Sequence, residues 1–174
     1  MKTALFAVAA LVLALPSAAQ EMGKKEKKTH PGFERMKQLV GTWQTETSEM
    51  GKVTVTYRMI SGGSTLMETI MPGTDHEMVT MYHLEGDDFV LTHYCVIGNQ
   101  PRMKAEKQTK DDVIDFKCSG NTGVKCATDM HMHSALFTFK DADRFTAEWS
   151  MMKGGKVDHS MKFAYERQKK EAAK

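Results

Sequence analysis

Residues 143–167 read DRFTAEWSMMKGGKVDHSMKFAYER, and this stretch decides the fold because it holds two strand-length runs separated by Lys-Gly-Gly. In each run apolar and polar residues alternate, which is the period of a β-strand with one buried face. Two such runs joined by glycines are typical of an antiparallel hairpin. The face predicted to point into the core comprises Phe145, Ala147, Trp149 and Met151, and then Val157, His159, Met161, Phe163 and Tyr165.

The same alternation runs through the chain from Gly41 onward. Eight earlier runs, separated by glycine, aspartate and asparagine turn signals, lie at 41–48, 52–60, 64–71, 77–84, 88–96, 101–109, 112–118 and 130–139. None is followed by the helical pattern that a parallel crossover needs. We therefore predict an all-β fold, a ten-stranded up-and-down antiparallel barrel, because closure of the sheet removes its exposed edges.

The chain before the first run divides into three parts. Residues 1–19 carry one cation, Lys2, a ten-residue apolar run and Pro16 before small residues, which is the pattern of a secretory signal peptide. The apolar run is shorter than the ~20 residues that a membrane span requires, so we expect no membrane insertion and a periplasmic or secreted protein. Residues 20–32 form a charged linker, and 33–40 (FERMKQLV) carry the apolar stripe of a short helix that covers one barrel mouth.

The barrel domain is expected to span 33–167, followed by a polar tail at 168–174. The formal net charge of the chain is +2, and the cations gather in the two polar ends. A basic face with interleaved aromatic residues is absent from the sequence, which excludes a nucleic-acid-binding protein. We expect a monomer or weak dimer whose partner is a small-molecule ligand.

Three cysteines are present. Cys118 and Cys126 flank the turn-like segment SGNTGVK and can form a disulfide, which would contribute about 2–3 kcal/mol by closing so short a loop. Cys95 would then be a buried free thiol. The alternative, that all three are reduced core residues, stays open.

Period two also predicts which histidines face the interior. In 88–96 the face that carries Phe89 also carries His93 and Cys95. In 129–137 (DMHMHSALF) the face that carries Ala135 and Phe137 extends back to His133 and His131, which leaves Met130 and Met132 outside. With His159, the predicted interior therefore contains four imidazoles and one thiol.

Several motifs resemble those of known barrel families. FERMKQLVGTW resembles the start of the calycin-type barrels: lipocalins, fatty-acid-binding proteins and, more distantly, nitrobindins. PGTDHEMVTMYHLEGDDFVLTHYC, GNQPRM, HMHS and DADRFTAEW, in this order across 33–167, resemble a family of small exported bacterial lipocalin-like proteins of unassigned function. The resemblance implies a ten-stranded calycin-like barrel and no particular activity. Nitrobindins bind haem through a histidine in the last strand, so it also implies His159 as a possible haem ligand.

The first functional hypothesis is a barrel that binds a small apolar or amphipathic ligand. An unpartnered buried polar group costs about 1–3 kcal/mol, so each inward imidazole needs a hydrogen bond, a water or a ligand. The alternative is a hydrogen-bonded cluster, such as His93 with Tyr82 or Thr80. The residues proposed to contact a ligand are Tyr57, Tyr82, His93, Cys95, Arg102, His131, His133 and Trp149.

The second hypothesis is a metal or haem protein that uses His131, His133 and His159. Two residues apart on one strand face, His131 and His133 lie ~6.5–7 Å from each other and can share an ion only if the strand bends. The sequence has no CxxC or HExxH motif. Its 15 methionines are scattered at core spacing, which favours a role as gap fillers over a copper site.

The third hypothesis is an enzyme in which His76, Glu77 or His93 acts as a base. His76 and Glu77 open the fourth run and can form an acid–base pair at the rim, or equally a capped turn. The sequence has no GxSxG motif. Arg102, in GNQPRM, can receive a carboxylate or phosphate, or can belong to a turn that satisfies its own backbone.

Overall fold

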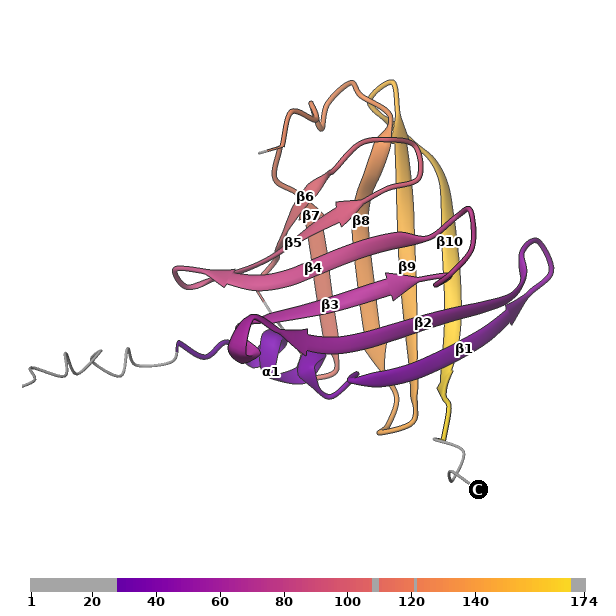
Figure 1. The fold of residues 1–174 in the computed structure, drawn as a ribbon. Coiled ribbons are helices and arrows are strands. Elements are labelled where there is room, and N and C mark those ends of the chain that lie inside the picture. The colour runs from indigo at the N-terminus through magenta and orange to yellow at the C-terminus, as the bar shows by residue number, and fades with distance from the viewer. Residues whose placement is uncertain (1–27, 108–109, 121, 170–174) are drawn as a thin grey trace, which may run out of the picture.

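The computed structural model describes residues 28–107, 110–120 and 122–169. Ten strands pair antiparallel with their sequence neighbours, and the first pairs with the last, which closes the barrel (Figure 1). The predicted fold class is confirmed. The strands are β1 (Gly41–Thr47), β2 (Gly51–Ile60), β3 (Thr65–Ile70), β4 (Met78–Glu85), β5 (Asp88–Tyr94), β6 (Arg102–Ala105), β7 (Val113–Cys118), β8 (His131–Phe139), β9 (Arg144–Lys153) and β10 (Lys156–Arg167).

The helix α1 (Pro31–Lys37) begins two residues before the predicted stretch. Pro31 stands in the first turn, where its missing N–H costs nothing, and the Nδ1 atom of His30 accepts a hydrogen bond of 3.1 Å from the backbone N–H of Gly32. The helix lies across one end of the barrel (Figure 1). There Met36 is fully buried and the Phe33 ring lies 5.4 Å from that of Phe89.

Arg167, the last residue of β10, ties the helix to the barrel wall. Its guanidinium donates to the backbone carbonyls of Gln38 (2.8 Å) and Val40 (2.9 Å), just beyond α1. The same group lies 4.1 Å from the centre of the Trp43 ring. One side chain therefore joins the helix, β1 and β10.

Aromatic side chains fill the half of the barrel nearest α1. They pack edge to face and with tilted rings at centroid distances such as 5.0 Å for Phe89 and Phe116 and 6.2 Å for Tyr82 and Phe137. Such geometry suits the ring quadrupoles. The fully buried members are Trp43, Tyr82, Phe89, Phe116, Phe137 and Phe145.

Two register shifts correct the predicted faces. In β8 the register shifts between Met132 and Ser134, so that Met132 lies opposite the buried Met151 and His131 lies opposite Met152. An extra residue in one strand reverses the alternation on its far side. The expectation that Met132 lies outside is therefore wrong, because Met132 is buried and lines an interior cavity; His131 is fully buried, as predicted, but neither it nor His133 lines that cavity.

His159 is the second correction. The register of β10 shifts between Val157 and His159, and the first five residues of the strand are exposed. The His159 side chain is 48% exposed, and its Nδ1 atom lies 2.9 Å from an Asp158 carboxylate oxygen. The expectation of a buried His159 is wrong because this end of β10 projects past the packed interior.

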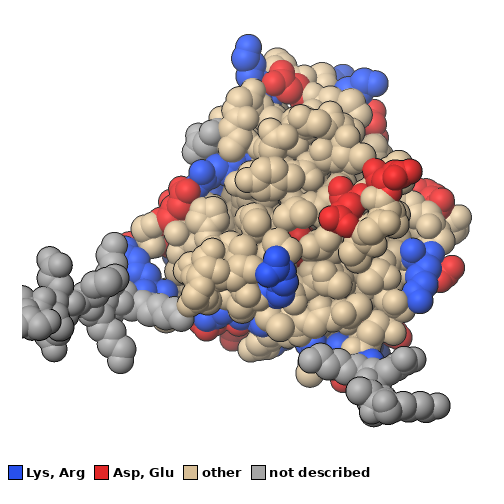
Figure 2. Space-filling view, in the orientation of Figure 1, with Lys and Arg blue, Asp and Glu red and all other residues tan. Residues whose placement is uncertain are grey.

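The predicted signal peptide lies outside the described residues, as do 20–27 of the linker and 170–174 of the tail. Among the described residues, no helix has the length and hydrophobicity needed to cross a membrane. On the face seen in Figure 2, cationic and anionic side chains are interspersed.

Candidate functional site: a buried polar row beside an apolar cavity

A row of four polar side chains crosses the interior on neighbouring strands. Tyr57 on β2 lies directly opposite Glu68 on β3, Glu68 opposite Thr80 on β4, and Thr80 opposite His93 on β5. All four are at most 2% exposed. Directly opposite residues of antiparallel strands bring their Cβ atoms to about 4.5–5.5 Å, so the sheet itself aligns these groups.

Glu68 is the acceptor at the centre of the row. Its Oε1 accepts a hydrogen bond of 2.5 Å from the Tyr57 hydroxyl and its Oε2 one of 2.7 Å from the Tyr82 hydroxyl. Burial raises the pKa of Glu68, and the hydrogen bonds from Tyr57, Tyr82 and Thr80 oppose that rise. Burial raises the pKa values of both tyrosines well above their usual range, so both phenols keep their protons and act as donors.

His93 stands at the other end of the row. Its Nδ1 atom lies 3.0 Å from the Thr80 hydroxyl oxygen, which is one of the two contacts that the sequence suggested. Burial lowers the pKa of His93 to about 4, so the imidazole is neutral at pH 7. When the Thr80 hydroxyl donates to Glu68, its oxygen accepts a hydrogen bond from Nδ1–H of His93, and Nε2 then carries a lone pair.

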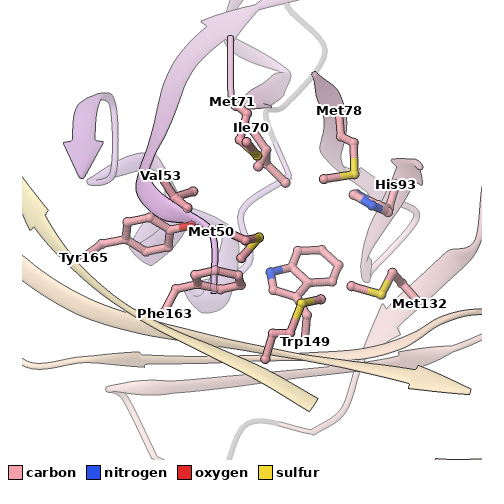
Figure 3. Close-up of a pocket in the computed structure, with 11 residues that line it drawn as sticks. Met50, Val53, Ile70, Met71, Met78, His93, Met132, Trp149, Phe163 and Tyr165 are labelled. Atoms are coloured by element: carbon pink, nitrogen blue, oxygen red, sulfur yellow. The ribbon is translucent and has the colours of Figure 1, made fainter. Parts of the chain in front are cut away.

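The Nε2 atom of His93 is buried and has no hydrogen-bond partner among the described residues. The His93 side chain belongs to the wall of an apolar cavity (Figure 3), which lies at the end of the barrel opposite α1 (Figure 1). The cavity has a volume of about 70 Å³. Its wall consists of Met50, Val53, Ile70, Met71, Met78, His93, Met132, Trp149, Met161, Phe163 and Tyr165.

The structure brings together only some of the residues predicted from the sequence. Tyr57 and Tyr82 belong to the polar row, and Trp149 forms cavity wall with its ring 5.0 Å from that of His93. Cys95 is a half-buried free thiol and does not line the cavity. Arg102 does not face the cavity either, because it forms an ion pair with Glu85.

Sequence reasoning missed Glu68 and Met132. The alternation of Leu66, Glu68 and Ile70 in 64–71 already put Glu68 on the inner face, so a charged residue between two apolar ones was the available signal. No such signal existed for Met132, because only the register shift in β8 turns it inward.

The predicted acid–base pair is part of a turn. His76 and Glu77 are exposed, and the Oε2 atom of Glu77 accepts a hydrogen bond of 2.5 Å from the backbone N–H of Gly73. The backbone N–H of His76 donates to the Thr74 hydroxyl oxygen at 3.2 Å. These contacts describe a capped turn.

The residues present do not fit a haem. His159, the ligand that the nitrobindin resemblance implies, is exposed and does not line the cavity. The cavity of about 70 Å³ is far below the roughly 300–1,000 Å³ of sites that hold drug-sized ligands. The cavity is therefore not a haem site.

Comparison of the chain with models of known protein families gives no match, and comparison with curated proteins gives none either. The closed ten-stranded barrel is compatible with a calycin-like fold. Membership of a lipocalin-like family stays a prediction from the motifs.

Proposed function

We propose that this protein is an exported barrel that binds one small amphipathic ligand in the methionine-lined cavity. The observation that carries the proposal is His93, a residue of the cavity wall whose buried Nε2 atom has no hydrogen-bond partner among the described residues. More than about nine in ten buried polar groups in native proteins are paired. A ligand with one donor group would pair Nε2 and place its apolar part against the methionines.

The polar row selects the kind of ligand. When Glu68 accepts from Thr80 and Thr80 accepts from His93, Nε2 is an acceptor, so the ligand must present an O–H or N–H group. The neutral imidazole does not attract an anion. A short-chain alcohol of a few non-hydrogen atoms suits both the lone pair and the size of the cavity, whereas an alkylamine would carry a charge into apolar surroundings.

The wall can adapt to its contents. Five of the eleven residues that line the cavity are methionines, whose three rotatable bonds and polarisable sulfur let them fill irregular spaces. Met50 is 40% exposed and comes from the turn between β1 and β2, at the side where the cavity meets solvent. We propose that these side chains move aside as the ligand enters.

NMR of protein labelled with 13C at the methionine methyls tests the proposal. We expect 1-butanol, used as the probe, to shift the methyl signals of Met71, Met78 and Met132 while that of the distant, fully buried Met36 stays unchanged. His93→Leu removes the acceptor and should weaken binding of butanol but not of xenon, a purely apolar probe. His93→Gln keeps an acceptor and is the matched control.

Two results would reject the proposal. If neither butanol nor xenon shifts the signal of any methionine methyl group in the cavity, the cavity does not take up such ligands. Equal affinity of wild type and His93→Leu for butanol would show that Nε2 plays no part. If both probes behave as expected, native mass spectrometry of protein from its own host identifies the retained molecule.

The exported location needs its own test. It rests on the signal-peptide pattern at 1–19 and on the disulfide between Cys118 and Cys126, since disulfides persist mainly in oxidising compartments. Fractionation of the host followed by N-terminal sequencing should find a mature chain that starts at Gln20. Recovery of the uncleaved chain in the cytosol would contradict export.

A further inference from the structure

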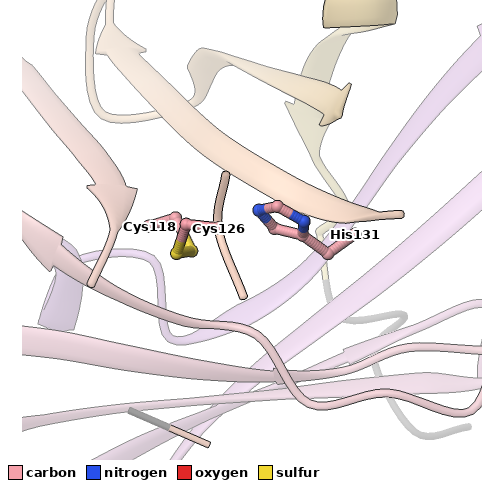
Figure 4. A group of neighbouring side chains, drawn as sticks. All are labelled: Cys118, Cys126 and His131. Atoms are coloured by element: carbon pink, nitrogen blue, oxygen red, sulfur yellow. A yellow bond between two sulfur atoms is a disulfide. The ribbon is translucent and has the colours of Figure 1, made fainter. Parts of the chain in front are cut away.

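A second cluster of side chains lies away from the cavity, where the loop 119–130 joins β7 to β8. Cys118 ends β7, Cys126 lies in the loop, and the two form a disulfide with a Cα–Cα distance of 6.1 Å. His131 is fully buried beside them. One imidazole nitrogen of His131 and the two sulfur atoms all lie within 4.8 Å of one another (Figure 4).

A fourth candidate ligand, His133, lies next to His131 but outside the set of three ligand atoms that lie within 4.8 Å of one another. The Nε2 atom of His131 lies 3.0 Å from the Nδ1 atom of His133, although alternate residues of a regular strand lie ~6.5–7 Å apart. The register shift between Met132 and Ser134 supplies the bend that makes this approach possible. In a tetrahedral zinc site with Zn–N bonds of about 2.0–2.1 Å, two ligating nitrogens lie roughly 3.3 Å apart.

A backbone group already orients the first imidazole. The Nδ1 atom of His131 lies 2.6 Å from the carbonyl oxygen of Asp129, so the proton sits on Nδ1 and Nε2 is left with its lone pair. Zinc-ligating histidines have this arrangement almost without exception, because the second hydrogen bond fixes the tautomer.

We propose that Cys118, Cys126, His131 and His133 form a zinc site when the disulfide is reduced. The set is Cys2His2, which is a typical combination for structural zinc. Oxidised, the two sulfurs are bonded to each other and cannot ligate as thiolates, so the same four residues hold the loop to β8 through a disulfide or through a metal, according to the thiol state. This inference does not rest on the proposed cavity function, because none of the four residues lines that cavity.

The chemistry balances with a dithiol as the reductant. The dithiol passes two electrons and two protons to the disulfide, becomes a disulfide itself and leaves two thiols on this protein. Zinc then displaces those two protons as it binds both thiolates. Binding also replaces the hydrogen bond between the two imidazoles, and the proton of His133 moves from Nδ1 to its Nε2.

Cobalt spectroscopy tests the site, since Co²⁺ occupies tetrahedral Cys–His sites and gives visible absorption. We expect the full chain, reduced with a phosphine, to bind one Co²⁺ with thiolate charge-transfer and tetrahedral d–d bands, which Zn²⁺ then abolishes. The oxidised chain should show neither band. His131→Gln and His133→Gln should weaken Co²⁺ binding at least about tenfold, whereas His159→Gln, the matched control on an exposed histidine, should not.

The variants distinguish a specific zinc site from nonspecific metal binding. Loss of the charge-transfer band in Cys118→Ser/Cys126→Ser, with the far-ultraviolet dichroism of the barrel retained, supports the proposal. If that double variant does not fold, the comparison of oxidised and reduced wild type decides instead. Equal Co²⁺ binding by both redox forms, or bands unaffected by His131→Gln and His133→Gln together, would overturn it.

Discussion

The two ends of the barrel are built from different side chains. At the end that α1 covers, rings such as Phe116 and Phe137 are fully buried, and each contacts several others. At the opposite end methionines line a cavity, and His93 in its wall has a buried Nε2 atom without a hydrogen-bond partner among the described residues. The polar row from Tyr57 to His93 lies between the two.

This difference indicates that one end of the barrel stabilises the fold and the other end binds the proposed ligand. The aromatic end contains most of the largest fully buried side chains, and such rings dominate the energetics of a protein core. The methionine-lined end can change shape at small cost. One barrel can therefore hold its fold and still admit a ligand, provided that the two tasks use different ends.

The strongest test exchanges one large side chain at each end. Phe137→Ala should lower the free energy of unfolding by about 3–5 kcal/mol, because it leaves a hole among rings that cannot move in to fill it. Met78→Ala, beside the cavity and partly exposed, should cost less than about 1.5 kcal/mol. Urea unfolding followed by tryptophan fluorescence measures both, and equal losses would remove the proposed division.

Lowering the pH should destabilise the protein through His93, which lies at the boundary between the two ends of the barrel. Burial lowers its pKa to about 4, whereas an unfolded histidine titrates near 6.5. As the pH falls from 6.5 to 4, His93 is protonated in the unfolded chain but stays neutral in the folded protein. The free energy of unfolding therefore falls by up to about 3 kcal/mol.

Comparison with His93→Gln isolates this loss. The raised pKa of Glu68 acts in the opposite direction, since a proton retained in the folded state favours that state below its folded pKa, but it contributes to both proteins. Wild type should therefore lose stability relative to the variant over pH 6.5–4. Parallel pH profiles would show that folded His93 is protonated in this range.

Substitution of Glu68 should lower the free energy of unfolding more than substitution of its neighbours in the polar row. Glu68→Gln removes one of two acceptor oxygens that receive hydroxyl donors and should cost about 2 kcal/mol, because a buried donor loses its partner. Tyr57→Phe leaves the carboxylate with Tyr82 and Thr80 and should cost about 1 kcal/mol. Thermal or urea unfolding at pH 7 measures both, and the reverse order would show that Glu68 is not the acceptor at the centre.

The smallest expected change in stability comes from adding one methylene group to a valine that lines the cavity, compared with one that does not. Val53 lines the cavity and Val55, on the same strand and face, does not. Val53→Ile should gain about 0.5–1 kcal/mol by filling part of the cavity, whereas Val55→Ile should cost about 1–3 kcal/mol through overpacking. If both substitutions destabilise the protein alike, the cavity is closed to an added methyl group.

The fold could be predicted from the sequence because its signals are local. The ten alternating runs and the glycine turns between them depend only on residues close in the chain, and most observed strands begin and end within two residues of the predicted ones. The exception is β6, which spans Arg102–Ala105 rather than 101–109. Its partners, β5 and β7, pair with only three residues each.

The site could be predicted only in part because its signals are not local. His93, Tyr57 and Tyr82 follow from period two, which holds along regular strands. The positions of Met132 and His159 do not, because register shifts in β8 and β10 move them, and a shift depends on the pairing with the neighbouring strand. The unpartnered state of His93 Nε2 also depends on four strands at once.

The pairing of β1 with β10 has a consequence for biosynthesis. Trp43 lies opposite Arg167, and the carbonyls that Arg167 binds belong to Gln38 and Val40, which lie 129 and 127 residues earlier in the chain. A ribosome makes the N-terminal side first, so β1 waits without its second partner until the last strand emerges. Barrel closure therefore comes after translation of the domain is complete, and until then the chain has an open edge that a chaperone can hold.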